Sequence, residues 1–238
     1  MHWHLGCFLE IMKRLAQVFP MATCLFPLLS FAETPDVTDK NTDGVNAAAI
    51  IHEINTARQN PALYAIFVEQ TRRNYSGRVR LKPDNVRSCT HDGVHAVDEA
   101  IRFLRGARPL PALALSPGLC SAAADHCREQ AGGAIGHRGS NGSGPGNRIA
   151  RYGVIAQGWA ENIAYGEHSA RAIVMALIID DGVRGRGHRK NIFNPNYTVV
   201  GAAYGPHARY GSICSIDFAG GYAEGTLARA ESNEANSF

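Results

Sequence analysis

Two histidines and one glutamate lie in short motifs whose residue types could support metal binding or acid–base chemistry. The motifs are GHRG at 136–139, WAENIAYG at 159–166 and GHRKNIFNP at 187–195, and they contain His137, Glu161 and His188. An imidazole in a glycine-rich loop is accessible and can bind a metal ion or transfer a proton. Glu161 lies between the apolar residues Trp159 and Ile163, so we expect its carboxylate to be partly desolvated and to need a partner.

These three residues form a plausible set of zinc ligands. A zinc ion on His137 and His188 would activate a water molecule, and Glu161 is the candidate base that would deprotonate it. Glu161 follows His137 by 24 positions and precedes His188 by 27 positions, and spacings of this length do not show that side chains converge. Three separate polar residues, each hydrogen-bonded to the backbone, are the alternative interpretation.

The order of these motifs resembles that of the CAP superfamily, which includes cysteine-rich secretory proteins, antigen 5 and plant pathogenesis-related group 1 proteins. The resemblance also rests on INTARQNP at 54–61, LALSPGL at 113–119 and VGAAYG at 200–205. It covers about Val45 to Tyr222 and points to the bacterial SCP-like branch. The ENI and HRxNI motifs, in that order, carry most of its specificity.

The resemblance implies an α+β fold, an α-β-α sandwich with a small antiparallel sheet between helices. It also implies a cleft with two histidines and two acidic residues, which in several members binds a divalent metal, often Zn²⁺. His137 and His188 match the two histidines and become the expected metal ligands, while Glu161 matches one acid and would act as acid, base or orienting partner. The fourth position has no clear match, and we assign Asp181 to the cleft with Asp180 as the alternative.

The same resemblance implies a binding domain whose partner is a lipid, sterol, glycan or envelope protein. A metal-assisted hydrolase of peptides or esters that uses Glu161 as its base is one alternative, and a non-catalytic structural envelope protein is another. A catalytic zinc ion usually has three protein ligands. Because only His137 and His188 can be named, we expect binding rather than catalysis.

The beginning of the chain has the pattern of an export signal. The basic run Met12-Lys13-Arg14 precedes a nearly continuous apolar stretch from Leu15 to Ala32, which ends in the small-x-small pattern Ser30-Phe31-Ala32. This predicts a secretory signal peptide over residues 1–32, with Met12 as an alternative start, and a secreted or periplasmic protein. No later segment is long enough to span a bilayer. The net charge of +3 gives no nucleic-acid footprint.

Downstream of the signal peptide we expect a flexible lead-in at 33–44, one domain at 45–222 and a polar tail at 223–238. Four of the six cysteines remain in this part: Cys89, Cys120, Cys127 and Cys214. An even number of cysteines in an exported chain predicts disulfides, in any of three pairings. Free buried thiols are the alternative.

Helical spacing of apolar residues predicts a helix over 45–70 that is interrupted near Asn60-Pro61, with further helices over 94–104, 116–131 and 170–179 and a helical turn over 147–152. Strands are predicted over 197–204 and 210–218 with a hairpin at 205–209, and residues 159–165 are a short strand or an irregular element. Loops are expected at 71–92, 132–146 and 180–190. The basic, glycine-rich run at 182–190 could receive an anionic ligand such as a phosphate or a lipid headgroup, although a solvated loop is favoured.

Overall fold

The computed structural model describes residues 44–82 and 85–226, which belong to one compact unit. The expected signal peptide, residues 33–43 of the lead-in and residues 227–238 of the tail lie outside the described residues. Among those described, no helix combines the length and the apolar character that a bilayer crossing requires.

The first two helices form as their sequence predicts. α2 (Ala47–Gln59) and α3 (Pro61–Arg72) are separated by Asn60, which ends the first helix and caps the second. The side chain of Asn60 accepts a hydrogen bond from the amide of Leu63 at 3.2 Å, and Pro61 occupies the first turn, where its missing N–H costs nothing. The predicted interruption is therefore confirmed.

The main sheet has four strands in the order β4-β6-β7-β5. β5 (Gly153–Tyr165), β6 (Val199–His207) and β7 (Gly211–Glu224) pair antiparallel, and only the two-residue β4 (Ala114–Leu115) runs parallel to its neighbour. β5 begins six residues before the predicted element and lies at an edge of the sheet. β7 extends to Glu224, two residues beyond the domain boundary expected after residue 222.

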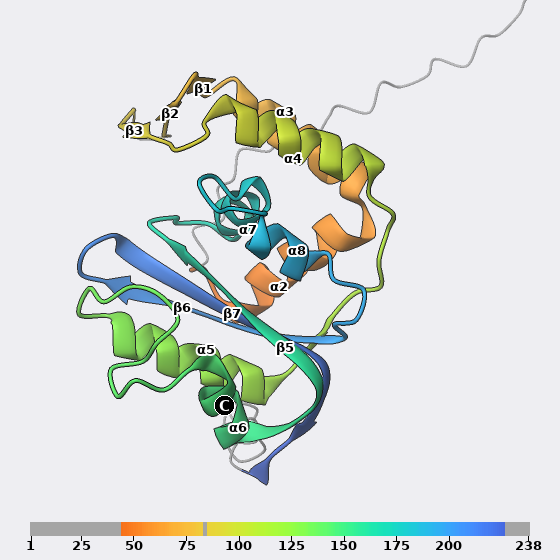
Figure 1. The fold of residues 1–238 in the computed structure, drawn as a ribbon, viewed down its shortest axis with the longest axis vertical. Helices are drawn as coiled ribbons and strands as arrows, with labels where there is room; N and C mark the ends of the chain where they lie inside the picture. Colours follow the sequence, from red (N-terminus) through yellow and green to blue (C-terminus); the bar gives the residue numbers. More distant parts are fainter. Residues whose placement is uncertain (1–43, 83–84, 227–238) are drawn as a thin grey trace, which may run out of the picture. The chain divides into compact units, whose positions relative to one another are not determined.

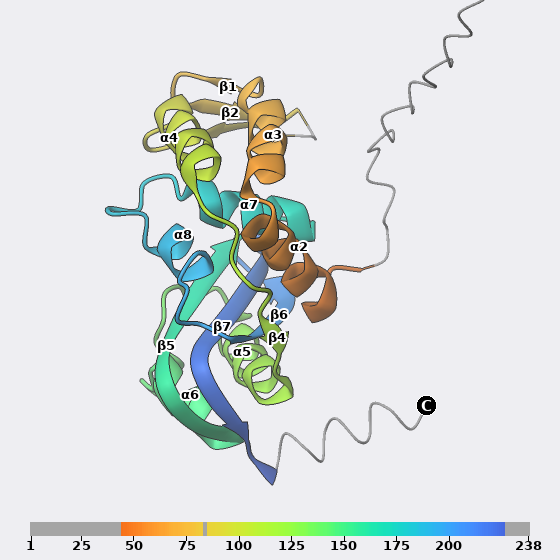
Figure 2. The ribbon, with the colours of Figure 1, turned by 90° about the vertical axis from the view of Figure 1, so that its right-hand side faces the viewer.

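Helices cover both faces of this sheet (Figures 1 and 2). α5 (Pro117–Gln130) and α6 (Pro145–Tyr152) pack on one face, and α2, α7 (Ala170–Ile179) and α8 (Gly187–Ile192) pack on the other. Every residue of β7 from Ser212 to Ala219 is buried, because alternate side chains of a strand point to opposite faces and both faces are covered. The α-β-α sandwich is confirmed.

Two of the predicted loops contain regular structure. The segment 71–92 holds three short antiparallel strands, β1 (Tyr75–Ser76), β2 (Val79–Leu81) and β3 (Arg87–Cys89), and it leads into α4 (Val94–Gly106). Strands of two or three residues are too short to show an alternating pattern in the sequence. The second case is α8, which begins inside the expected glycine-rich loop, so His188 lies on a short helix.

The four cysteines in the described part of the chain are free thiols. Cys127 and Cys214 are buried, Cys120 is partly buried and Cys89 is exposed. The predicted disulfides are therefore not found among the described residues, and the alternative of free thiols describes this structure. Burial raises the pKa of the Cys127 thiol to about 11, so this thiol is protonated and unreactive at neutral pH.

Candidate functional site

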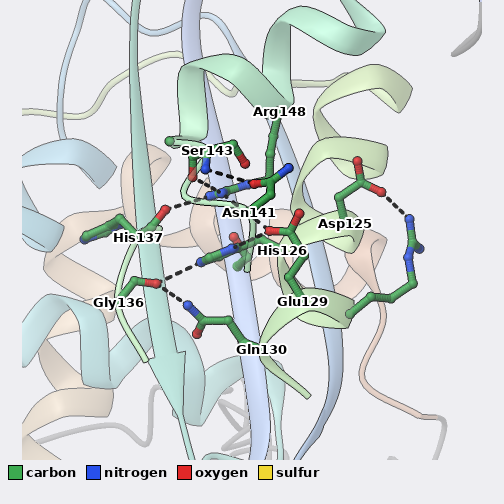
Figure 3. A network of polar contacts seen from close by, with 12 residues as sticks. Asp125, His126, Glu129, Gln130, Gly136, His137, Asn141, Ser143 and Arg148 are labelled. Atoms are coloured by element: carbon green, nitrogen blue, oxygen red, sulfur yellow. Dashed lines mark hydrogen bonds and ion pairs between the residues drawn. The ribbon is translucent and has the colours of Figure 1, made fainter. Parts of the chain in front are cut away.

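The backbone next to His137 is held on two sides (Figure 3). The carbonyl of Gly136 accepts hydrogen bonds from α5, one from His126 Nε2 at 2.9 Å and one from the Gln130 amide. The amide of Gly136 donates to the Tyr165 hydroxyl of β5 at 3.0 Å, and that hydroxyl donates to Gln130 at 2.7 Å. Burial lowers the pKa of His126. The long glycine-rich loop is thus fixed at the residue that precedes His137.

His137 forms a pair with Glu161 of β5. Its Nδ1 lies 2.7 Å from Glu161 Oε1, and an ionised carboxylate can only accept, so Nδ1 donates. The Glu161 side chain is 1% exposed, whereas that of His137 is 52% exposed. The buried acid therefore fixes the orientation of an imidazole that is open to solvent, with Nε2 as its remaining nitrogen.

Arg148 of α6 balances the charge of Glu161. Its Nη2 lies 2.6 Å from Glu161 Oε2, and both side chains are buried. The same guanidinium donates to the carbonyl of His137 at 3.2 Å, and the Ser215 hydroxyl contacts Glu161 Oε2 at 3.3 Å. Both oxygens of Glu161 are therefore engaged by groups of the protein.

A second buried acid lies beside Glu161. Asp217 pairs with Glu161 in the β5–β7 register, is fully buried, and neither of its side-chain oxygens has a hydrogen-bond partner among the described residues. Burial and the neighbouring Glu161 charge raise the pKa of Asp217 well above its usual value, and Arg148 opposes this only in part. A neutral Asp217 leaves Glu161 as the partner of Arg148.

His188 forms the second pair, with Asp180. Its Nδ1 lies 2.7 Å from Asp180 Oδ1, and its backbone amide donates to Asp180 Oδ2 at 2.9 Å. The Asp180 side chain is 1% exposed and that of His188 is 22% exposed. Asp180 follows the last turn of α7 in a left-handed conformation with φ 56°, and this turn carries its carboxylate back toward α8.

Asp181 has a different role from the one we assigned to it. Its carboxylate accepts hydrogen bonds from the backbone amides of His91, Asp92 and Gly93, at 2.6–2.8 Å, and so anchors the start of α4. The acid that contacts His188 is Asp180. Of the two candidates for the fourth cleft position, the alternative Asp180 is thus the one in direct contact with His188, and the position itself stays a prediction.

The two pairs are connected through consecutive residues of β5. Glu161 contacts His137, and the Asn162 side chain donates to the carbonyl of His188 at 3.0 Å. Asn162 in turn accepts from the side chain of Asn191 at 2.8 Å. Consecutive side chains of a strand point to opposite faces, so the two pairs reach this edge strand from the two faces of the sheet.

Two imidazoles, each oriented by a buried carboxylate, have the arrangement that proteins use to fix histidine ligands of metals. Among residues 44–82 and 85–226, no group of three or more His, Cys, Asp or Glu side chains is placed to hold a metal ion. Each histidine is thus paired with one acid, and a metal site that joins His137 and His188 stays a prediction.

Sequence reasoning missed the groups that support Glu161. Arg148 and Arg151 are three residues apart in one short basic segment, and nothing in the sequence shows which of them is buried. Asp217 does carry a signal, because it lies between Ile216 and Phe218 in a predicted strand. The argument applied to Glu161, an acid within an apolar strand, would have selected Asp217 as well.

Comparison with known proteins places this architecture in a family. The family model described as "Cysteine-rich secretory protein family" matches residues 52–218, which is more than half of the chain. Protein YkwD of Bacillus subtilis strain 168 is 32% identical over 84 residues, which make up 35% of this chain and 30% of that protein. The alignment thus spans less than a third of that relative.

Two solved structures are similar at low identity. An extracellular protein with an SCP domain from Bacillus anthracis has a TM-score of 0.36 and 19% identity, and the match covers 53% of this chain and 37% of that one. An outer surface protein from Borrelia burgdorferi has a TM-score of 0.37 and 19% identity, over 46% of this chain and 78% of that one. The family model carries the assignment: the chain belongs to the cysteine-rich secretory protein (CAP) family.

Proposed function

We propose that this chain is a binding domain that acts outside the cytoplasm and recognises its ligand with the imidazoles of His137 and His188. The observation that carries the proposal is that both histidines have the same kind of contact with a buried acid. Each donates through Nδ1 to a buried carboxylate at 2.7 Å, and His137 is exposed to solvent while His188 is partly exposed. Such pairing fixes the ring orientation and leaves Nε2 available to a ligand.

A divalent metal such as Zn²⁺ suits these donors, because neutral imidazole nitrogens are common zinc ligands. His137 and His188 would hold the ion, while Glu161 and Asp180 would fix the two rings. The metal would supply a positive charge that attracts an anionic or carbonyl group of the partner. Lipids, sterols, glycans and envelope proteins are partners compatible with the expected export signal and with the family.

The environment of Glu161 favours binding over hydrolysis. A general base must reach the proton that it removes, directly or through one water molecule. The Glu161 side chain is 1% exposed, and its two oxygens contact His137 and Arg148 at 2.7 and 2.6 Å. These contacts support a role of Glu161 in positioning His137, and so support binding over hydrolysis.

The proposal is tested by calorimetric titration of the protein with Zn²⁺. We expect His137→Ala and His188→Ala each to abolish tight binding, and Glu161→Gln and Asp180→Asn each to weaken it by about 10- to 100-fold, the usual effect of losing the partner of a histidine ligand. His52→Ala, at an exposed position on α2, is the matched control and should bind as the wild type does.

Two results would overturn the proposal. One is unchanged Zn²⁺ affinity in both alanine variants while circular dichroism shows that they are folded. The other is a fall in melting temperature in His137→Ala with no change in affinity for any metal, which is what a purely structural role predicts.

A further inference from the structure

Two adjoining surface pockets lie between the start of α4 and the glycine-rich segment that follows α7. Each has a volume of about 550 Å³, within the range of sites that hold small ligands. Both are lined by His91, Asp92, Glu99 and Arg186. We call the two together the double pocket; neither is lined by His137 or His188.

The shared centre of the double pocket is balanced in charge. Arg186 donates to Glu99 at 2.8 Å and to Asp92 at 2.8 Å, and Arg189 donates to Glu99 at 2.9 Å. The bond from Arg186 lowers the pKa of Asp92 to about 2, so this acid is ionised at neutral pH. Two guanidinium groups therefore face two carboxylates, and this centre adds rigidity but no net charge.

Four further cations flank that centre. Arg184 and Lys190 line only the first pocket, and Arg78 and Arg102 line only the second. All four are exposed, and within the part of the chain that the structure describes none of them forms an ion pair with a carboxylate. Arg102 donates to the carbonyl of Asp98, and its charge also acts on the Asp98 carboxylate, whose direct ion pair is with Arg72. The double pocket thus carries four exposed cations that have no direct ion pair among the described residues.

Two of the four exposed cations lie in each pocket, on either side of the neutral centre. This division limits the kind of anion that can contact all four. One phosphate group placed on one side would leave the cations of the other side without a partner. A chain with several anionic groups can contact both pairs at once and gain from both. Arginine is suited to phosphate and sulfate because its planar guanidinium binds their oxygens through two parallel hydrogen bonds.

We propose that the double pocket binds a linear polyanion whose phosphate or sulfate groups are spaced along a flexible chain, and that it does so independently of the two histidines. Arg184 and Lys190 would contact one stretch of the polymer, and Arg78 and Arg102 the next.

The test measures binding of two fluorescently labelled polyanions to the full chain by anisotropy. Linear inorganic polyphosphate is the phosphate probe, and a heparin-derived oligosaccharide is the sulfate probe. Two double variants remove the cations on each side: Arg184→Gln with Lys190→Gln, and Arg78→Gln with Arg102→Gln. A third, Arg108→Gln with Arg209→Gln, removes two exposed cations outside the double pocket and is matched in charge.

We expect each double-pocket variant to weaken binding of at least one probe by about tenfold, since two exposed ionic contacts are lost, and the charge-matched control to change it by less than about twofold. The preferred probe identifies phosphate or sulfate as the group that is recognised. Orthophosphate should not displace the bound polymer at concentrations that saturate a single-phosphate site.

Three outcomes would overturn the proposal. Equal losses in the control and in the double-pocket variants would show that only net charge matters. Full displacement by orthophosphate, with dependence on one side alone, would show a single-anion site. Binding to vesicles of anionic lipid without binding to either soluble polymer would show a membrane surface instead. Because all substituted residues are exposed, the variants should melt as the wild type does, which separates loss of binding from loss of folding.

Discussion

At the scale of single residues, the protein concentrates its buried charge beneath His137. Arg148 and Glu161 are both buried and lie 2.6 Å apart, and each is the main counter-charge of the other. A buried pair of this kind adds little stability compared with apolar residues of similar shape, but removing one partner leaves an uncompensated charge in the interior. The pair therefore constrains the position of Glu161 more than it stabilises the fold.

Replacing Arg148 should show this constraint. We expect Arg148→Met to lower the free energy of unfolding by about 3–5 kcal/mol, because Glu161 would remain buried without its counter-charge. Arg151 lies on the same helix as Arg148, is exposed, and pairs with Asp125 of α5. Arg151→Gln should therefore lower the free energy of unfolding by no more than about 1 kcal/mol. Denaturant unfolding measures both, and equal losses in the two variants would contradict the role of the buried pair.

Asp217 should make the free energy of unfolding depend on pH. An acid whose pKa is higher in the folded than in the unfolded protein contributes stability that is complete below its unfolded pKa, about 3.9, and that is lost as the pH rises through its folded pKa. Burial and Glu161 raise the pKa of Asp217. Asp217→Asn removes this loss, so the variant should gain stability relative to the wild type as the pH increases.

Unfolding by urea between about pH 4 and about pH 8 checks this dependence on protonation. The difference in unfolding free energy between Asp217→Asn and the wild type should be smallest at the acid end and should grow toward the alkaline end. A difference that stays constant over the whole range would mean that Asp217 is ionised throughout in the folded protein.

At the scale of secondary-structure elements, α5 lies unusually close to the sheet at Gly201 of β6. A Cβ added at this position would overlap the backbone of Cys120 and Leu119. We expect Gly201→Ala to destabilise the protein by about 1–3 kcal/mol or more, because packed elements cannot separate without losing contacts elsewhere. Gly106→Ala is the control, since a Cβ there would meet nothing within 4 Å.

Thermal unfolding compares the two glycine variants directly. A loss in Gly201→Ala with little change in Gly106→Ala supports close packing of α5 on β6. Equal behaviour of the two would mean that α5 can move away from the sheet, and the anchoring of Gly136 by His126 and Gln130 of α5 would then be loose as well.

The helices could be predicted from the sequence because each carries its own local signal. Asn60, Ser116 and Ser169 each cap the helix that follows them, and apolar residues recur on one face of each helix. The short strands β1 to β3 carry no such signal. His137, Glu161 and His188 were found from their motifs, whereas the choice between Asp180 and Asp181 depended on a left-handed turn at the end of α7 that adjacent aspartates cannot reveal.

At the scale of the whole molecule, the sandwich is held by packing and hydrogen bonds, with free thiols at the four described cysteines. Alkylation of the native protein should modify Cys89, which is exposed, and spare Cys127 and Cys214, which are buried and whose thiol pKa values are raised by burial. Alkylation after unfolding without a reductant should modify all four. Mass spectrometry of the peptides measures this, and a pair that reacts only after reduction would reveal a disulfide.

Two surfaces of the molecule also differ in their chemistry. The histidine pairs offer imidazole nitrogens beside the edge strand β5, and the double pocket offers four exposed cations around a charge-balanced centre. The proposed metal ligands and the proposed anion-binding groups are thus different residues. Variants of one surface should leave binding at the other unchanged, so failure of one proposal does not imply failure of the other.

The orientation of the two imidazoles is tested most directly by the ¹⁵N chemical shifts of their ring nitrogens, recorded with and without Zn²⁺. We predict that His137 and His188 carry their proton on Nδ1, where Glu161 and Asp180 accept it at 2.7 Å, and that added Zn²⁺ shifts the Nε2 resonances of both rings. Protonation of both histidines on Nε2, with no response to Zn²⁺ in a folded protein, would contradict this account.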